Sequence, residues 1–424
     1  MDYYIRPEQK IPVIEETEVL VIGAGPAGIG AAVAAARAGA KVVLIDSAGA
    51  PGGISTVGLM SHWTGTVDNA LYREILERSA RKNDFSNEVT TVIDPEKLKI
   101  LYIEMLAESN VKLMLYTFAS GVIMDGSEVK GVIIENKSGT SVIKSQIVID
   151  ASGDGDIAAK AGAEYIIGRE TDGKMQPATL MFKVGGVDFD RAVFLSRFED
   201  TYETERGELQ ALAREMLDAP AGHVLLYKST LPGIVTCNMT NCINIDGTKA
   251  SDLTEAEICC RLQIEPIVSF LRKYVPGYEH CFAVSSASLI GIRETRHFKG
   301  VKTITEHDIL SARFFEDWVV KGAYFNFDVH SLTGAGLDET GAQKTFGQEE
   351  GYTIPYGCLV PQKIDGLLLA GRNISGTHMA HSNFRAMPIC LAIGNAAGTA
   401  AAIAIRKKCR PRDVSASDIQ SELE

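Results

Sequence analysis

Residues 18–46, EVLVIGAGPAGIGAAVAAARAGAKVVLID, carry the pattern that decides the fold. The run 18–22 is short and apolar, as expected of a buried parallel strand. Residues 29–38 are rich in small side chains and predict a helix that ends at Gly39. A second apolar run, 41–45, predicts the next strand. Strand, helix and strand within about 30 residues form a βαβ unit.

The turn between the first strand and the helix has the spacing GxGxxG. The first glycine makes a tight turn, the second lets the backbone approach a pyrophosphate, and the third lets helix and strand pack closely. Asp46 ends the second strand, where an acidic side chain would hold a ribose hydroxyl. The expected dinucleotide contacts are Gly23, Gly25, Pro26, Ala27, Gly28, Asp46 and Ser47.

Two further glycine-rich segments favour FAD over NAD. A second turn, Gly52–Gly53, follows Asp46 directly. Far along the chain, GLLLAGR (366–372) predicts another buried strand and turn, and Pro388 is a good first residue for a helix. The N-terminus of that helix could stabilise negative charge on a reduced flavin. The residues expected around the flavin are Gly52, Gly53, Ile54, Ser55, Gly371, Arg372, Met387, Pro388 and Ile389.

These motifs are part of a similarity to a known family that covers about residues 17–405. The chain resembles a large bacterial family of FAD-dependent oxidoreductases, distant relatives of fumarate reductase flavoproteins. The other matching segments are VIDASGDGDIAAKAGAEY (148–165), ASLIGIRETRHFKG (287–300), FNFDVH (325–330) and THMAHSNFR (377–385). The resemblance implies FAD and a glutathione-reductase-like fold, and it names no substrate.

The resemblance also places a second loop, with Gly153, Asp154 and Asp156, near the phosphate and ribityl portion of the cofactor. Glycines after a buried strand allow close backbone approach. A solvated turn that feeds a helix fits the same residues. Residues 54–56 contain no histidine or cysteine, so we expect non-covalent FAD, with His62 the nearest candidate for an attachment point.

The predicted fold class is α/β, with a glutathione-reductase-like FAD/NAD(P)-binding Rossmann domain and an inserted mixed α+β substrate domain. Residues 15–170 and the returning part 348–408 would form the FAD-binding domain. Residues 171–347 alternate strand-like stretches with helical ones, among them a helix expected at 189–217. This middle segment would cover the flavin and form the substrate pocket.

Arginines and histidines in two motifs are the main catalytic candidates. Arg293 and Arg296 flank a carboxylate, an arrangement that suits an anionic substrate or a structural salt-bridge network. His378, His381 and Arg385 directly precede the flavin-facing helix, where a histidine could move a proton or merely satisfy backbone groups. The two histidines also have metal-ligand spacing. No acidic or cysteine partner is near in sequence, so no metal is expected.

A third motif contains Asp328 and His330, which alternation would place on one face of a strand. Both side chains could face the substrate. It is equally possible that His330 is a core histidine whose hydrogen bonds are made within the protein. Cys237 and Cys242 have a spacing used in disulfide reductases. They lie far from the first nucleotide motif, and the sequence has no second GxGxxG. We therefore reject a disulfide reductase as the function.

Net charge and apolar stretches exclude some classes of function and location. The net charge of −12 disfavours nucleic acid as a partner. The apolar stretch 386–405 contains proline, asparagine and glycines, so we expect a packed internal helix and no membrane span. The first residues show no apolar signal region, and a cytoplasmic chain with reduced cysteines is expected.

The sequence therefore predicts hydride transfer between flavin N5 and a small polar, anionic substrate. Electrons would pass to or from a separate partner, because no second nucleotide motif is visible. A reductase of activated C=C bonds and a non-redox protein with structural FAD are the alternatives. The oligomeric state, including a homo-oligomer, stays open.

Overall fold

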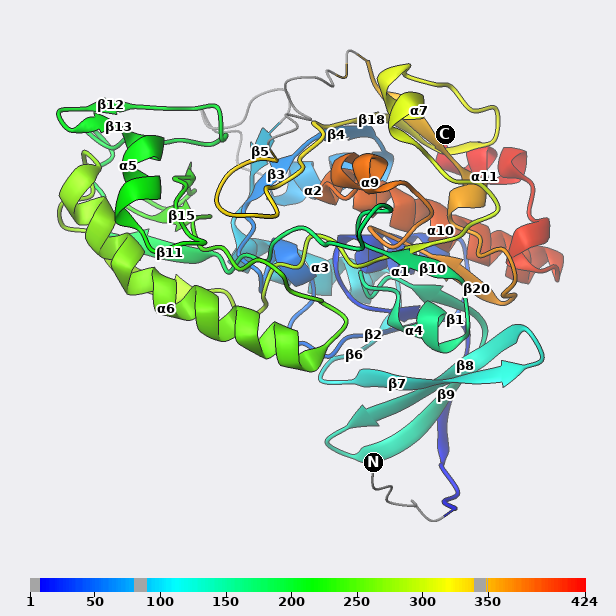
Figure 1. The fold of residues 1–424 in the computed structure, drawn as a ribbon. Coiled ribbons are helices and arrows are strands. Elements are labelled where there is room, and N and C mark those ends of the chain that lie inside the picture. Colours follow the sequence, from blue (N-terminus) through cyan, green and yellow to red (C-terminus); the bar gives the residue numbers. More distant parts are fainter. Residues whose placement is uncertain (1–7, 80–89, 339–347, 349) are drawn as a thin grey trace.

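The main sheet contains seven strands in the order β6-β2-β1-β9-β8-β7, with β20 paired to β9 (Figure 1). The computed structural model describes residues 8–79, 90–338, 348 and 350–424. The parallel strands of this sheet are β1 (Val13–Ile22), β2 (Val42–Ile45), β6 (Lys112–Met114), β9 (Gly139–Asp150) and β20 (Leu367–Leu369). The strands predicted at 18–22, 41–45 and 366–370 are thus confirmed.

Strand β9 joins the parallel part of the sheet to an antiparallel part. Its first half pairs with β8 (Glu128–Asn136), which pairs with β7 (Phe118–Asp125), and its last residues pair with β20. Strands β7, β8 and β9 therefore form an antiparallel meander. Because β20 comes from the far end of the chain, the sheet is completed only when both ends of the sequence meet.

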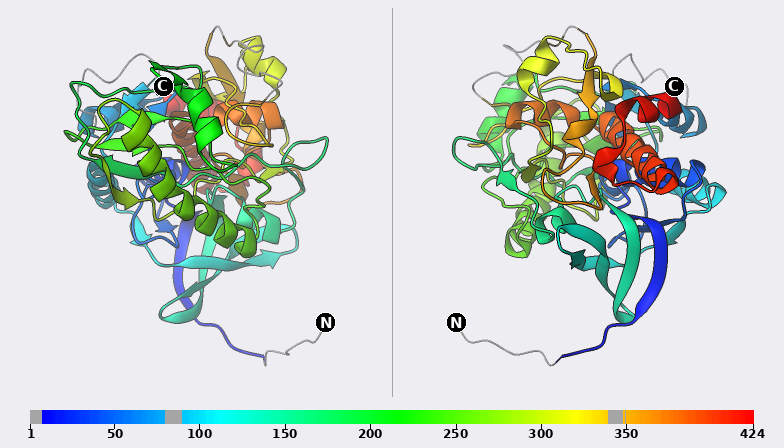
Figure 2. Two further views of the ribbon diagram at one scale, coloured as in Figure 1. Left: turned by 60° about the vertical axis from the view of Figure 1, so that its left-hand side comes forward. Right: turned by 90° about the vertical axis from the view of Figure 1, so that its right-hand side faces the viewer.

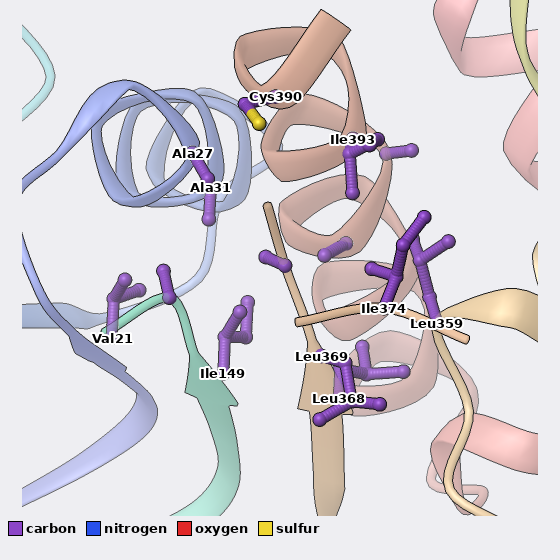
Figure 3. Packing of buried hydrophobic residues seen from close by; sticks show 14 of the residues in the cluster. Val21, Ala27, Ala31, Ile149, Leu359, Leu368, Leu369, Ile374, Cys390 and Ile393 are labelled. Atoms are coloured by element: carbon purple, nitrogen blue, oxygen red, sulfur yellow. The ribbon is translucent and has the colours of Figure 1, made fainter. Parts of the chain in front are cut away.

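Two helices rich in small residues lie against each other beside the sheet, α1 (Pro26–Arg37) and α10 (Met387–Lys407) (Figure 3). A Cβ added at Gly394 would lie 1.9 Å from the Ala27 carbonyl oxygen, and one at Gly398 would lie 2.1 Å from that of Ala31. Helix α10 is the one helix among the described residues that is long and apolar enough to cross a membrane, and 89% of its apolar window is buried. Close packing against α1 accounts for its composition.

The middle of the chain forms a separate sheet and two helices on one side of the molecule (Figures 1 and 2). The sheet order is β14-β15-β11-β16. Buried residues between 178 and 290, with Leu59, make up two apolar clusters of their own. The elements are β11 (Phe182–Gly185), β14 (Leu226–Lys228), β15 (Val235–Cys237), β16 (Phe282–Ser286), α5 (Leu209–Met216) and α6 (Ala250–Tyr274).

The chain rejoins the main apolar core well before residue 347. Buried residues from Phe298 onward belong to the same cluster as the N-terminal strands. Strand β18 (Trp318–Tyr324) pairs with β4 (Thr66–Asp68) and with β19 (Tyr352–Pro355). The change of core therefore lies near residue 298, whereas the sequence placed a boundary at 347, outside the described residues.

The predicted helix at 189–217 is wrong over most of its length, since only α5 is helical there. The Asp188 carboxylate accepts from the N–H of Asp190, and that of Asp200 accepts from the N–H groups of Ser196 and Arg197. Such side-chain bonds to nearby backbone compete with a helix.

The remaining elements surround these two cores. The helices are α2 (Ala70–Ser79), α3 (Pro95–Glu108), α4 (Asp156–Lys160), α7 (Glu306–Leu310), α9 (His378–Phe384) and α11 (Ala416–Leu423). The strands are β3 (His62–Thr64), β5 (Thr90–Val92), β10 (Tyr165–Ile167), β12 (Glu203–Thr204), β13 (Gly207–Glu208) and β17 (Arg296–Phe298). The spacing of Leu71, Ile75 and Leu76 also predicts an amphipathic helix near 69–82. Helix α2 confirms it from Ala70 to Ser79, and residues 80–82 lie outside the described part of the chain.

Candidate active site

The GxGxxG turn leaves room for a ligand at its second glycine. A Cβ at Gly23 would lie 2.7 Å from the Ala151 oxygen, and one at Gly28 would lie 1.7 Å from the Gly23 oxygen. A Cβ at Gly25 would meet no atom of the described residues within 4 Å. Gly25 is also the N-cap of α1 and has no side chain to occupy the first N–H groups of the helix. The turn therefore fits a bound pyrophosphate.

Asp46 holds this turn in place. One carboxylate oxygen accepts from the N–H of Ala24 at 2.6 Å, and the other accepts from the N–H of Ala48 at 2.7 Å. A carboxylate has further lone pairs, so these bonds leave it able to accept from a ribose hydroxyl. Ser47 directly follows Asp46 at the end of β2.

The second glycine turn lies against the first. The N–H of Gly52 donates to the Ala24 oxygen at 2.6 Å, and a Cβ at Gly53 would lie 3.1 Å from the Cα of Gly25. Gly52 and Gly53 both have positive φ, which favours glycine. The hydroxyl of Ser55 donates to the Gly52 oxygen at 2.6 Å. The sequence thus brings the two predicted glycine turns together.

The segment after the second turn leads to the middle part of the chain. A Cβ at Gly291 would lie 3.3 Å from Cδ1 of Ile54 and 2.9 Å from the oxygen of Thr179. Residues 177–179 and 291–293 therefore lie beside the loop that follows the phosphate turn. This contact links the cofactor loop to Arg293.

The loop with Gly153, Asp154 and Asp156 is held by two arginines. Nη2 of Arg372 lies 2.7 Å from Oδ1 of Asp154, and a Cβ at Gly153 would lie 3.0 Å from the same guanidinium. Arg296 donates to the Asp154 carbonyl and to Oδ1 of Asp156, each at 2.8 Å. Arg296 is therefore a structural partner of this loop, and its predicted role in binding an anionic substrate is not supported.

The returning segment meets α1 at the start of α10. Gly371 has φ +93°, and a Cβ there would lie 3.0 Å from the Cβ of Ala27. Helix α10 begins with Met387, Pro388 and Ile389, and its N-cap residue makes no side-chain cap. Its first N–H groups are therefore available to a negative charge, as the sequence predicts.

Arg293 points away from Arg296 and into the molecule. Its Nη1 donates to the Pro177 oxygen at 2.6 Å and to Oγ1 of Thr179 at 2.8 Å, so both hydrogen bonds go to neutral oxygens. Burial, followed by repulsion from Arg385, lowers the pKa of Arg293 to about 10. The second arginine near Arg293 is thus Arg385, contributed by the segment before α10.

Asp328 lies between Arg385 and His330. Arg385 donates to its carboxylate at 2.6 Å, and Nε2 of His330 lies 3.3 Å from the same carboxylate. Burial would raise the pKa of Asp328, but the charges of His330 and Arg385 outweigh burial and lower it. Burial, and then the charge of Arg293, lowers the pKa of His330 to about 4. Asp328 and His330 contact each other, but the strand predicted for their segment is wrong, because 325–329 form no regular strand.

The middle sheet contributes polar residues that sequence reasoning missed. His223 is buried, and its Nε2 lies 2.9 Å from the Asn238 oxygen. Asn238 donates to the Tyr227 hydroxyl at 3.0 Å, and His62 stacks on the Tyr227 ring with centroids 4.4 Å apart. Phe198 packs against the rings of both His223 and His330. Phe198, His223, Tyr227 and Asn238 belong to no motif, so no signal in one sequence could select them.

His378 and His381 meet two residues of the IGIRETRHF motif instead of open space. Nδ1 of His378 and Nε2 of His297 lie 2.6 and 2.8 Å from Oε1 of Glu294. Burial would raise the pKa of Glu294, but these two hydrogen bonds outweigh it and lower the pKa. Burial, with His297 nearby, holds the pKa of His381 well below its usual range. No acidic residue is near these histidines in sequence, but Glu294 reaches them from a distant loop.

The sequence model of the family described as FAD dependent oxidoreductase matches residues 18–423. The chain belongs to this family. As an FAD-dependent oxidoreductase it uses FAD, which fits the open space at Gly25. Its fold is the mixed α/β fold of an FAD-binding Rossmann-type domain. None of the curated proteins matches this oxidoreductase significantly.

Solved structures share this fold at low sequence identity. A geranylgeranyl bacteriochlorophyll reductase-like protein from Thermoplasma acidophilum is 14% identical with a TM-score of 0.51, over 96% of this chain and 82% of that one. The p-nitrophenol 4-monooxygenase PnpA from Pseudomonas putida is 12% identical with a TM-score of 0.46, over 97% and 84%. At such identities the likeness is one of fold alone.

Proposed function

We propose that this FAD-dependent oxidoreductase transfers a hydride between flavin N5 and a small substrate that carries a carboxylate. Arg293 and Arg385 would bind the carboxylate, and His330 would move the proton. The observation that carries the proposal is the group of Arg293, Arg385, Asp328 and His330, in which His330 is buried and the other three are partly buried. The group lies beside the cofactor loop and directly before α10.

The charge of this group favours an anion. Two guanidinium groups are present, and the carboxylate of Asp328 is already bonded to Arg385 and His330. With His330 neutral, the group carries a net positive charge at a partly buried position. A substrate carboxylate would balance that charge and accept a bidentate hydrogen bond from a guanidinium.

The Asp328–His330 pair supports a role in proton transfer. A histidine whose pKa is lowered to about 4 is neutral at pH 7 and can accept a proton. Asp328 orients the ring through its bond to Nε2. We assign this role to His330 and not to His378 or His381, because both of these lie in the separate group around Glu294.

FAD, when bound, supplies the hydride chemistry and leaves the protein to bind, orient and move protons. The GxGxxG turn would hold the pyrophosphate, and the N-terminus of α10 would face the negative end of the flavin ring. The parallel strands with the β7–β9 meander support a glutathione-reductase-like arrangement. We expect non-covalent FAD, because residues 54–56 contain no histidine or cysteine. Electrons would leave to, or arrive from, a separate partner.

Anaerobic flavin reduction tests the proposal. The FAD-loaded protein is mixed with a panel of small hydroxy acids and amino acids, and the visible absorbance of oxidised flavin is followed. Bleaching by members of this panel is the expected result. A protein that no such acid bleaches, but whose reduced flavin is rapidly reoxidised by enoic acids, would be a C=C reductase. A flavin that responds to neither set would contradict the proposal and favour a structural role for FAD.

A further inference from the structure

The side chains of Glu294, His297 and His381 converge in the core and form a group that shares no residue with the group of Arg293, Arg385, Asp328 and His330. Each offers one ligand atom, and these three atoms lie within 4.8 Å of one another. All three side chains are inaccessible to solvent, with relative exposures of 0%, 2% and 1%. They come from two segments far apart in sequence, 287–300 and α9.

Two nitrogen atoms in this group have no partner. Nδ1 of His297 and Nδ1 of His381 are buried and make no hydrogen bond to any described residue. The two rings stand nearly perpendicular, with centroids 4.7 Å apart. A buried polar atom without a partner is costly, and most such atoms in proteins bind a side chain, a water or an ion.

We propose that Glu294, His297 and His381 bind a divalent transition-metal ion. Two imidazoles and one carboxylate are a ligand set used by zinc and by non-haem iron. Calcium and magnesium prefer oxygen ligands alone, so they fit this set poorly. Two imidazoles and one carboxylate also leave at least one coordination position for a water molecule or another ligand.

The groups around the ligands suit a metal site. Nδ1 of His378 lies 2.6 Å from Oε1 of Glu294, and the N–H of Gln176 donates to Oε2 at 3.2 Å. Outer hydrogen bonds of this kind orient ligating carboxylates in metal sites. His378 is therefore a positioning residue in this assignment.

The nearby arginines do not compete for Glu294. Arg372 is paired with Asp154 at 2.7 Å, and Arg385 is paired with Asp328 at 2.6 Å. Each of these guanidinium charges has a carboxylate of its own. The charge of Glu294 is therefore left to the histidines and to the ion.

Equilibrium dialysis of the FAD-loaded full chain tests the site. The protein is first freed of metal with a chelator and then dialysed against Zn²⁺, and bound zinc is measured by elemental analysis. We expect one tightly held Zn²⁺ per chain. His297→Gln and His381→Gln should each weaken binding at least about tenfold, the size seen when metal-site partners are removed. His307→Gln is the control, because the His307 side chain is exposed. This variant should bind zinc as tightly as the wild type does.

Two results would overturn the assignment. One is a wild-type protein that retains no zinc under these conditions, and the other is an equal loss in His307→Gln and in the two cluster variants. If a cluster variant fails to fold, as shown by loss of the flavin spectrum, X-ray absorption at the zinc edge of the wild type decides. Scattering from two imidazoles at about 2.0–2.1 Å is expected. A zinc with sulfur ligands or without imidazole would contradict the site.

Discussion

Arg385 donates from one nitrogen to both the carbonyl oxygen and the carboxylate of Asp328, at 2.8 and 2.6 Å. The two residues lie 57 positions apart, one just before α10 and the other in the FNFDVH segment. This double contact fixes a guanidinium beside the start of α10. The hydrogen bonds of Arg293 go instead to neutral oxygens, those of Pro177 and Thr179.

Replacing Asp328 by Asn tests that charge balance. Removal of the carboxylate makes the group more positive, so carboxylate ligands should bind more tightly to Asp328→Asn. The same change leaves His330 and Arg385 to share one neutral amide oxygen in place of a carboxylate, so the ring is held less firmly and the rate of flavin reduction should fall at least about a hundredfold. Stopped-flow reduction over a range of substrate concentrations gives the binding and rate constants separately. Weaker binding together with an unchanged rate would contradict the account.

The proton-transfer role of His330 predicts both a rate and a pH dependence. His330→Gln should reduce the flavin about 10²–10⁴-fold more slowly with FAD still bound. Because the base must be deprotonated and its pKa is lowered to about 4, the wild-type rate should fall only as the pH drops through about 4. His307→Gln, at an exposed site, is the control. A wild-type rate of flavin reduction in His330→Gln would show that another group accepts the proton.

Buried histidines should make the fold sensitive to acid. Burial lowers the pKa of His62 from 6.5 to about 4. The unfolded chain therefore takes up a proton near pH 6.5 and the folded chain only near pH 4. The free energy of unfolding should fall over this range, by roughly 3 kcal/mol from this side chain. His62→Phe should show a shallower decline in denaturant titrations between pH 7 and 4, and an unchanged slope would contradict the burial argument.

The close contact between α1 and α10 predicts that one added methyl group, at Gly394, lowers the free energy of unfolding. Ala at Gly394 would favour the helix by about 1 kcal/mol, but its Cβ would lie 1.9 Å from the backbone oxygen of Ala27. The helices must separate, so Gly394→Ala should lower the free energy of unfolding by about 1–3 kcal/mol net and weaken FAD retention. Gly334→Ala is the matched control, because its Cβ would meet no described atom within 4 Å. Equal stability of the two variants would refute the packing argument.

Local patterns explain why the nucleotide-binding half of the fold could be predicted. The βαβ unit, the glycine turns and the strand at 366–370 each depend on residues adjacent in sequence. The helix predicted at 189–217 failed because aspartates there bond the nearby backbone, which periodicity does not reveal.

Contacts between distant loops explain what the sequence could not show. Glu294 and His378 are 84 positions apart, and Arg293 and Arg296 face opposite directions although only two residues separate them. A motif identifies residue types, whereas the direction of each side chain follows from how the loop packs. For the same reason His223 and Tyr227 gave no signal.

Discrimination between a carboxylate and its amide is the most direct test of the central claim. Pairs of small acids and the corresponding amides are titrated into the FAD-loaded wild type and Arg293→Gln, and binding is read from the change in the flavin spectrum. The account predicts that the wild type binds the acid about 10–100-fold more tightly than the amide, and that Arg293→Gln loses this preference. Equal affinity of the wild type for acid and amide would contradict the proposal that Arg293 and Arg385 bind an anionic substrate.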